Sequence, residues 1–290
     1  MSITLDQNIS DRLSGGMTLG GGVELPFLAP VMWVINGDAK LKAIGGAQYY
    51  GGWACKAEDL DDAVQHWAVN IPPNFALAEI TTSDNTTFNA YTARSVIVAP
   101  IAVRQFWIDA DGRRSAGYVD GGRHAVQAIC MMAARLGHKD VVALEPCGPV
   151  MLSAKGYQAR NLLGAFSAWN KHTAGLRRKV APGVPAWCFY LSIGTFSKDR
   201  AQIMVGKTSQ SPITPVTAYL PDDLSEEKLT RLFAGNEVAN QMADLLDQAQ
   251  DWLAAGKQES DRGASGGAGR GEPEYGPPPE NWPPEEDIPF

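Results

Sequence analysis

The sequence has few cysteines and no long apolar segment. Its four cysteines stand far apart, without a Cys-x-x-Cys pair or a histidine at zinc-finger spacing from any of them. They are Cys55, Cys130, Cys147 and Cys188. This spacing argues against a structural zinc site and favours buried, reduced thiols. The longest purely apolar run, residues 96–103, has 8 residues and contains a proline, so it is too short to cross a bilayer. We therefore expect no metal, no cofactor and no membrane span.

Signals for secretion and for a phosphate-binding loop are lacking as well. Residues 1–6 carry neither a basic start nor an apolar stretch, so we expect a cytoplasmic protein. Residues 13–30 are rich in glycine, but their spacing fits neither the Walker nor the dinucleotide motif, and no Lys-Ser/Thr follows. We interpret them as an ordered arm or loop.

The end of the chain carries the most specific signal. Its last six residues combine three acids with an apolar, aromatic-terminated tripeptide: Glu285, Glu286, Asp287, Ile288, Pro289 and Phe290. In this ending the chain resembles the single-stranded DNA-binding proteins of bacteria, whose acidic C-termini finish in Ile-Pro-Phe. The resemblance implies that the six residues bind host replication, recombination and repair enzymes. Phe290 would enter an apolar pocket while its α-carboxylate meets Lys or Arg.

The residues before this tip predict a flexible tether. Gly, Pro, Ser and charged residues dominate residues 258–280, and they offer too little apolar surface to offset the entropy of ordering. We therefore expect a globular core over residues 1–257, a disordered linker over 258–280 and an acidic tip over 281–290. The core is long enough for one large domain or two small ones.

Charge is distributed unevenly along the chain, although the net value is only −7. Residues 94–207 carry 16 Lys+Arg and 6 Asp+Glu, whereas residues 1–93 carry 4 and 10. An excess of +10 in the central segment suits a polyanion such as nucleic acid. The alternative, that these cations pair with the acidic flanks on the surface, stays open.

Hydrophobic periodicity predicts an α+β protein. Strands are expected over residues 31–35, 96–108, 116–119, 141–144, 186–193, 202–205 and 216–220. Helices are expected over residues 57–68, 121–136, 157–171 and 225–255. An Asp-Gly turn joins the strands 96–108 and 116–119 as a hairpin. We prefer this turn to the alternative that Asp109 and Asp111 bind a metal. The last helix either closes the core or pairs with a second protomer, so a homo-oligomer stays open.

The resemblance implies a compact OB barrel of five strands, but this core is more than twice as long and does not follow that strand pattern. Our expectation is an OB-like β-barrel elaborated with helices, with an unrelated α+β fold as the alternative. Single strands are held by a basic groove and by aromatic rings on which bases stack. The residues expected to contact nucleic acid are Arg104, Phe106, Trp107, Arg113, Arg114, Tyr118, Arg123, Lys171, Arg177, Arg178, Lys179, Trp187 and Tyr190. For each aromatic residue, core packing is the alternative.

Together these features predict a protein that binds single-stranded DNA independently of its sequence, in replication, recombination or repair. Its tip would recruit partner enzymes. A recombination mediator or strand-annealing protein is one alternative, and a nuclease carrying a similar tail is another. A nuclease needs clustered carboxylates to hold Mg²⁺, and the basic segment has few, so we expect no enzymatic activity.

Overall fold

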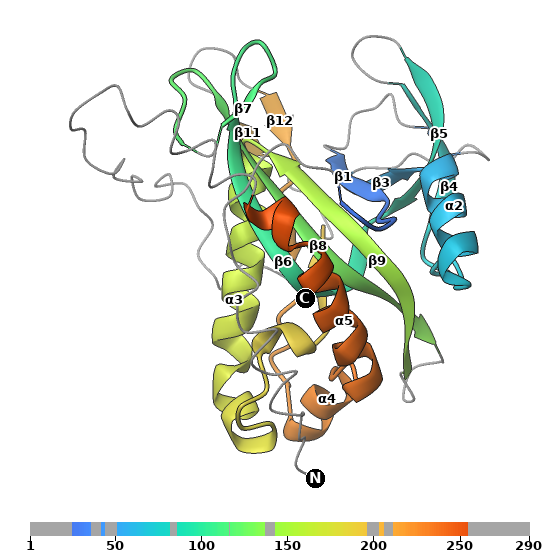
Figure 1. Cartoon of the computed structure of the whole chain (residues 1–290), viewed down its shortest axis with the longest axis vertical. Coiled ribbons are helices and arrows are strands. Elements are labelled where there is room, and N and C mark those ends of the chain that lie inside the picture. The colour runs from blue at the N-terminus through green and yellow to red at the C-terminus, as the bar shows by residue number, and fades with distance from the viewer. Residues whose placement is uncertain are drawn as a thin grey trace.

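The computed structural model describes residues 25–35, 42–43, 51–81, 86–115, 117–136, 143–195, 203–205 and 211–254. The predicted linker and tip lie outside these residues, as does most of the glycine-rich arm. The described part confirms the α+β class: helices pack around one strongly curled sheet that forms a half-barrel (Figure 1).

The secondary structure consists of short strands at both ends of the sheet and three long ones in the middle. The strands are β1 (Val31–Ile35), β2 (Lys42–Ala43), β3 (Gly52–Lys56), β4 (Ala76–Thr81), β5 (Thr87–Ala93), β6 (Ser95–Ile108), β7 (Arg114–Ser115), β8 (Arg123–Leu136), β9 (Ala143–Lys155), β10 (Leu191–Gly194), β11 (Ile203–Val205), β12 (Ser211–Ile213) and β13 (Thr217–Ala218). The helices are α2 (Ala57–Trp67), α3 (Tyr157–Val180), the 3₁₀ helix η1 (Ala186–Cys188), α4 (Glu226–Arg231) and α5 (Asn236–Gln248), followed by helical residues 250–254.

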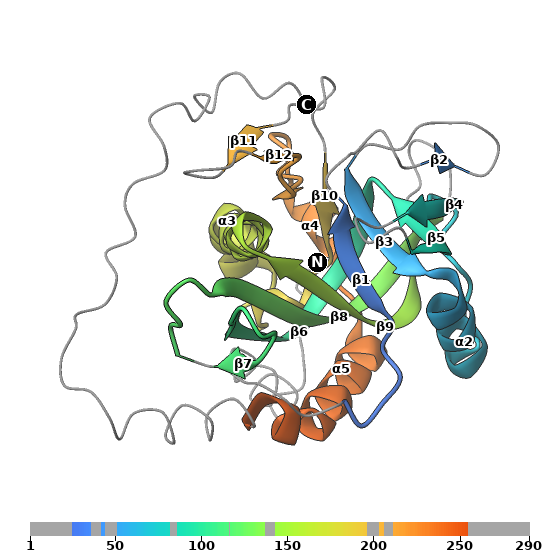
Figure 2. The ribbon, with the colours of Figure 1, turned by 90° about the horizontal axis from the view of Figure 1, so that it is seen from above.

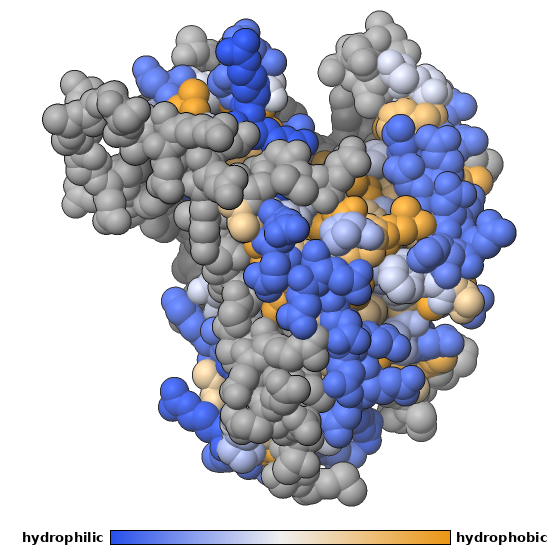
Figure 3. Space-filling view, in the orientation of Figure 1, coloured by the Kyte–Doolittle hydropathy of each residue, from blue (hydrophilic) through white to orange (hydrophobic). Residues whose placement is uncertain are grey.

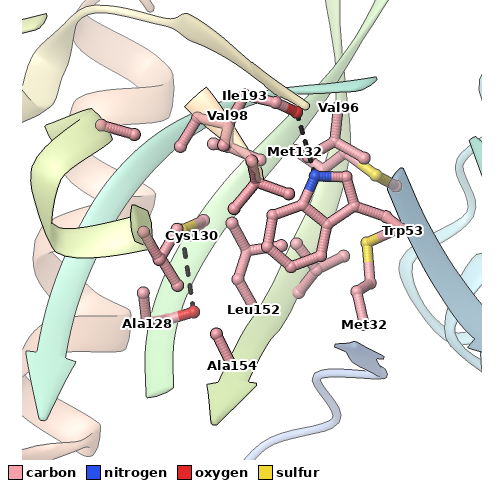
Figure 4. Packing of buried hydrophobic residues seen from close by; sticks show 14 of the residues in the cluster. Met32, Trp53, Val96, Val98, Ala128, Cys130, Met132, Leu152, Ala154 and Ile193 are labelled. Atoms are coloured by element: carbon pink, nitrogen blue, oxygen red, sulfur yellow. Dashed lines mark hydrogen bonds between the residues drawn. The ribbon is translucent and has the colours of Figure 1, made fainter. Parts of the chain in front are cut away.

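The strand order of the main sheet is β13-β10-β6-β8-β9-β1-β3-β5-β4-β2, with β7 on the edge of β6, and β11 and β12 pair separately. Every described pair is antiparallel except β1 with β9. The sheet curls until β3 approaches β10, where the buried indole Nε1 of Trp53 donates a 3.0 Å hydrogen bond to the carbonyl of Ile193 (Figure 4). This bond joins two strands that are not neighbours in the sheet.

Two hydrophobic clusters lie on opposite faces of the long strands β6, β8 and β9. Along β8, Ile129 and Met131 belong to the cluster under α5, whereas Cys130 and Met132 belong to the cluster under α3. Figure 2 shows α3 and α5 on opposite sides of β6 and β8. We call these sides of the long strands the α3 face and the α5 face.

The helix predicted over residues 121–136 is wrong, because residues 123–136 form β8. Residues 125–134 are buried on both faces, so the segment reads as a continuous apolar run without the alternation of a half-buried strand. Periodicity cannot distinguish such a strand from a buried helix, and its alanines, methionines and leucine favour helix by propensity.

The single helix predicted over residues 225–255 is also wrong. It divides into α4 and α5 at Gly235, whose φ of +86° falls in the region that favours glycine. The residues between the helices bind the segment before β10: Tyr190 N donates to Leu232 O, and Ala234 N donates to Cys188 O. This contact also explains why the strand predicted over 186–193 begins only at Leu191.

The strand predicted over residues 116–119 is also wrong, because the hairpin strand is β7 at Arg114–Ser115 and residues 117–119 are not part of a strand. Several other predictions hold. The strands over 31–35 and 96–108 and the helix over 57–68 are confirmed, and the helix over 157–171 extends to Val180. In the view of Figure 3, polar residues cover α2 and α5, and apolar residues gather in the hollow between them. Among the described helices, none has the length and apolar character needed to cross a membrane.

Candidate nucleic-acid interface

The turn predicted after β6 is confirmed. Its backbone is held by Asp109, whose carbonyl accepts from Gly112 N at 3.1 Å and whose carboxylate Oδ1 accepts from Arg113 N at 2.8 Å. Gly112 adopts a φ of +80°, as such a tight turn requires. Asp109 therefore serves the turn, and the described residues contain no group of three His, Cys, Asp or Glu side chains placed to hold a metal ion.

Three cations gather on the α5 face at this end of the sheet. Ile108, the last residue of β6, is flanked by Arg114 of β7 on one side and Arg123 of β8 on the other. Directly opposed residues of antiparallel strands share a face. The same rule places Lys155 of β9 beside them, through the row Phe106, Ala125, Lys155. Arg114, Arg123 and Lys155 are exposed, and the Arg114 guanidinium lies 5.2 Å from the ring centroid of the buried Phe106.

Three rings gather on the opposite, α3 face. Trp107 opposes His124 across the β6–β8 pair, with ring centroids 5.4 Å apart. Tyr118, from the loop that leads to β8, lies edge-on to Trp107 at 4.8 Å. Tyr118 is 62 % exposed, and Trp107 and His124 are half-buried. A planar base could therefore reach aromatic surface here.

His124 also joins this group to helix α3. Its Nε2 is 3.1 Å from the side-chain oxygen of Gln105, and its carbonyl accepts from Gly156 N, just before α3. Burial, and then the charge of Arg160 on the first turns of α3, lower the pKa of His124 below its ordinary value. The imidazole is therefore neutral at neutral pH.

We call the end of the sheet formed by these residues the hairpin site. It comprises Trp107, Arg113, Arg114, Tyr118, Arg123, His124 and Lys155. Its cations and its rings occupy opposite faces of the same strand pair. Five of its members are among the residues predicted from the sequence.

Three predicted contact residues are instead buried. Arg104 and Phe106 are 2 % exposed and Tyr190 is 1 % exposed, so none of them presents a surface to nucleic acid in this structure. Tyr190 packs in the cluster under α5, and its hydroxyl has no hydrogen-bond partner among the described residues. The strand predicted over residues 186–193 begins only at Leu191, and Cys188, Phe189 and Tyr190 before it are all buried. This corrects the prediction for the three side chains.

Arg104 has a structural environment of its own. Its Nε and one Nη donate to Gln127 Oε1 at 2.8 and 2.6 Å, and the other Nη donates to the carbonyl of Trp252 at 3.3 Å. The guanidinium stacks on the Trp252 indole at 3.8 Å. Burial, and then Arg114, lower the pKa of Arg104 to about 9, which leaves it charged at neutral pH. Arg104 thus fixes the last helical turn to the sheet.

The remaining predicted residues lie away from the hairpin site. Lys171, Arg177, Arg178 and Lys179 are near the C-terminal end of α3, and a 24-residue helix spans about 36 Å. Trp187 is half-buried and lies edge-on to Phe166 of α3, with centroids 6.5 Å apart. Apart from the three buried side chains, the predicted contact residues therefore fall into two separate groups, one at the hairpin site and one on or beside α3.

His124 and Lys155 were not predicted from the sequence. Lys155 lies beside the other cations only because of the register between β8 and β9. The sequence pattern predicted a helix in place of β8, so this register could not be predicted. A weaker sequence signal for Lys155 was available. Lys155 and Arg160 lie on either side of the start of a helix that its hydrophobic period predicts.

Compared with known proteins, the chain matches no family model, no curated protein and no solved structure. The similarity described at residues 285–290 concerns the tip alone. The features of the molecule that bear on its function are therefore the hairpin site, the distribution of charge and the tip.

Proposed function

We propose that this protein binds single-stranded DNA without sequence preference and that the hairpin site is its main contact. The observation that carries the proposal is the pairing of cations and rings at one end of one strand pair. Arg114, Arg123 and Lys155 are placed to neutralise phosphates, while Trp107 and Tyr118 offer rings to bases. Phosphate neutralisation combined with stacking is how proteins hold single strands without reading their sequence.

The rings favour a single strand over a duplex as the ligand. In a duplex the bases are already stacked on one another and their faces are closed to protein. Unpaired bases can be splayed onto aromatic side chains, at about 1–3 kcal/mol per base. A surface that served duplex backbones alone would need the cations but not Trp107 and Tyr118.

The strand connections support an OB-like barrel as the platform. The strands β10, β6, β8, β9 and β1 are consecutive in the sheet, and α3 lies between β9 and β10 along the chain. An OB barrel also has three antiparallel strands, a helix before the fourth strand, and a fifth strand parallel to the third. Here β1 takes the fifth place but precedes the others in sequence, as in a circular permutation. In OB barrels, strands 2 and 3 and the loop between strands 1 and 2 bind oligonucleotides. The hairpin site comprises residues of that loop and of the adjoining strand ends.

The acidic tip supports a second role, recruitment of enzymes that act on the bound strand. A terminal aromatic ring together with its free carboxylate forms one recognition unit, and residues 285–290 provide it. We propose that the protein coats single strands through its core and binds partner enzymes through this tip. The proposed activity is binding alone.

The test is a salt titration of the full chain with labelled single-stranded DNA, duplex DNA and RNA. Each phosphate neutralised on a single strand contributes about −0.7 to the slope of log affinity against log salt. The triple variant Arg113→Gln, Arg114→Gln, Arg123→Gln is therefore expected to flatten the slope by about 2, on all sequences alike. Trp107→Ala is expected to weaken binding by about 1–3 kcal/mol, through lost stacking.

A matched control removes three cations elsewhere: Lys56→Gln, Lys228→Gln and Arg231→Gln. These side chains form exposed ion pairs with Glu58, Asp223 and Glu227. The control should leave the salt slope unchanged, because the net charge change is the same but the position differs. Equal slopes for wild type and the arginine triple variant would reject the hairpin site. Added complementary strands in the same assay test for annealing, and Mg²⁺ tests for cleavage.

A further inference from the structure

Helix α3 has an unusual distribution of charge. Its 24 residues include five Lys+Arg and no Asp or Glu. On the side opposite its buried face, a residue recurs every three to four positions, and each of these residues is exposed. These residues, here called the α3 stripe, are Arg160, Gly164, Ser167, Lys171, Gly175 and Arg178. The stripe therefore combines three cations with three residues that have very small side chains.

Helix α3 offers the cations of the stripe no acidic side chain of its own. Neither Lys171 nor Arg178 forms an ion pair with a carboxylate among the described residues. At the C-terminal end of the stripe, Lys171, Arg177 and Arg178 line an open pocket together with Ala174, Pro182 and Gly183. Arg177 is held in place there by donating to Thr173 Oγ1 at 3.1 Å. Cations near a helix C-terminus interact favourably with its dipole, but this effect reaches only the last turn and does not concern Arg160 or Lys171.

The two glycines of the stripe are not explained by packing. A Cβ atom added to Gly164 or Gly175 would meet no atom within 4 Å, and neither residue has a φ that requires glycine. Glycine inside a helix is unfavourable relative to alanine. Small side chains on a cationic surface allow a ligand backbone to approach the helix closely.

The stripe begins at the hairpin site. Gly156, next to the first residue of α3, donates to the carbonyl of His124, and Arg160 is close enough to affect the protonation of that histidine. From Arg160 to Arg178 the helix rises about 27 Å. Figure 1 shows α3 (yellow-green) running along one side of the molecule, beside the long strands.

We propose that the sugar–phosphate backbone of a single strand continues from the hairpin site along the α3 stripe to the pocket at Arg177 and Arg178. This proposal extends the proposed function, because it assigns a second contact for the same ligand. Charge complementarity selects the occupant: the stripe has repeated cations, small side chains and no rings. It therefore contacts phosphates, while bases are stacked only at the hairpin site.

The test compares oligonucleotides of two lengths, about 5 and about 25 nucleotides, within and beyond the usual range for one OB barrel. The full chain carries Lys171→Gln and Arg178→Gln. We expect unchanged affinity for the short strand, whereas for the long strand affinity falls several-fold and the salt slope flattens by about 1.4. The matched control, Lys228→Gln with Arg231→Gln, should alter neither.

A second variant tests close approach without a change of charge. Gly175→Leu should leave the melting temperature unchanged or raise it, since leucine favours helix and a Cβ atom added at this exposed position meets no atom within 4 Å. It should nevertheless weaken binding of the long strand and spare the short one. Loss of melting temperature together with loss of binding would count against the proposal.

The outcomes are distinguishable. If wild type binds neither strand, the proposed function fails. If wild type binds both and the α3 variants bind both equally well, or lose both equally, the α3 stripe is not a path for the strand and the hairpin site stands alone. If the double variant binds both lengths more tightly, the stripe instead holds the acidic end of this chain, and the proposal is overturned.

Discussion

The long strands β6 and β8 pair with each other along most of their length, yet their surroundings differ between the middle and the end. In the middle, the last helical turn covers the sheet, and Arg104 is buried between Trp252 and Phe106. At the end of the pair, the Arg114 guanidinium lies 5.2 Å from the ring centroid of the same Phe106, and Arg114 is exposed. Both positions pair an arginine with an aromatic ring. Whether such a pair stabilises the fold or presents a binding surface depends on whether a helix covers it.

The largest expected effect is in the covered middle. Trp252→Ala should lower the free energy of unfolding by about 3–5 kcal/mol, because it removes a buried indole and uncovers the guanidinium beneath it. Urea unfolding measures the change. Tyr118→Ala, at the exposed end, is the matched aromatic control and should stay within about 0.5 kcal/mol of wild type while DNA binding weakens. Similar destabilisation by the two variants would mean that the middle and the end do not differ as described.

A smaller effect is expected when the buried cation itself is replaced. Arg104→Met leaves Gln127 Oε1 without its two donors and should cost about 1–3 kcal/mol. Replacing both residues, Arg104→Met with Gln127→Met, should recover much of that loss, since a well-packed apolar pair can substitute for a buried polar one. A double-mutant cycle measures the coupling. Additive losses would show that Gln127 does not depend on Arg104.

The same contrast explains how much of the fold and the site the sequence could predict. Strand 31–35, helix 57–68 and the turn at Asp109 were predictable, because each depends on local signals such as an acidic first turn or an Asp-Gly pair. Segment 123–136 was not, because burial on both faces removes the period of a strand. Gly235 did signal the break between α4 and α5, but the apolar stripe continues across it.

Residue type correctly predicted most of the side chains that belong to the hairpin site at the exposed end of the strand pair. In the covered middle, the same criterion gave a wrong prediction. Arg113, Arg114, Tyr118 and Arg123 follow a recognisable turn, where exposure is the rule. Arg104 also stands near aromatic residues in the sequence. Its burial, however, depends on Trp252, which is 148 residues away along the chain. Such a long-range contact leaves no local pattern in the sequence.

A third prediction uses the acidic end to probe the exposed cations. Residues 258–290 carry 2 Lys+Arg and 8 Asp+Glu, and Trp252, shortly before them in the chain, lies beside Arg104. A flexible chain of about 25 residues has a root-mean-square reach of roughly 25–30 Å, enough to approach the hairpin site. Removing residues 258–290 should therefore tighten binding to single-stranded DNA several-fold at low salt.

The difference should shrink as salt rises, because the Debye length falls to about 8 Å at physiological ionic strength. The matched control deletes Phe290 alone, which keeps every acidic side chain of the tail. This variant should bind DNA like wild type but lose its partner enzymes, measured by pull-down from a bacterial lysate. Equal DNA affinity with and without residues 258–290 at low ionic strength would limit the tail to partner binding.

The smallest effect concerns His124, which stands between the covered middle and the exposed end. Its pKa in the folded protein is lowered, first by burial and then by Arg160, from an ordinary value of 6.5. As the pH falls through that ordinary value, the unfolded chain therefore takes up a proton that the folded protein does not bind. Protonation stabilises the unfolded state, so the histidine lowers stability on the acid side and contributes nothing of this kind well above pH 6.5. His124→Gln should make the decline in unfolding free energy between about pH 7.5 and about pH 5.5 shallower than in wild type. An equal decline in both proteins would place the imidazole in solvent-like surroundings, and the hairpin site would then be more open than its half-buried ring indicates.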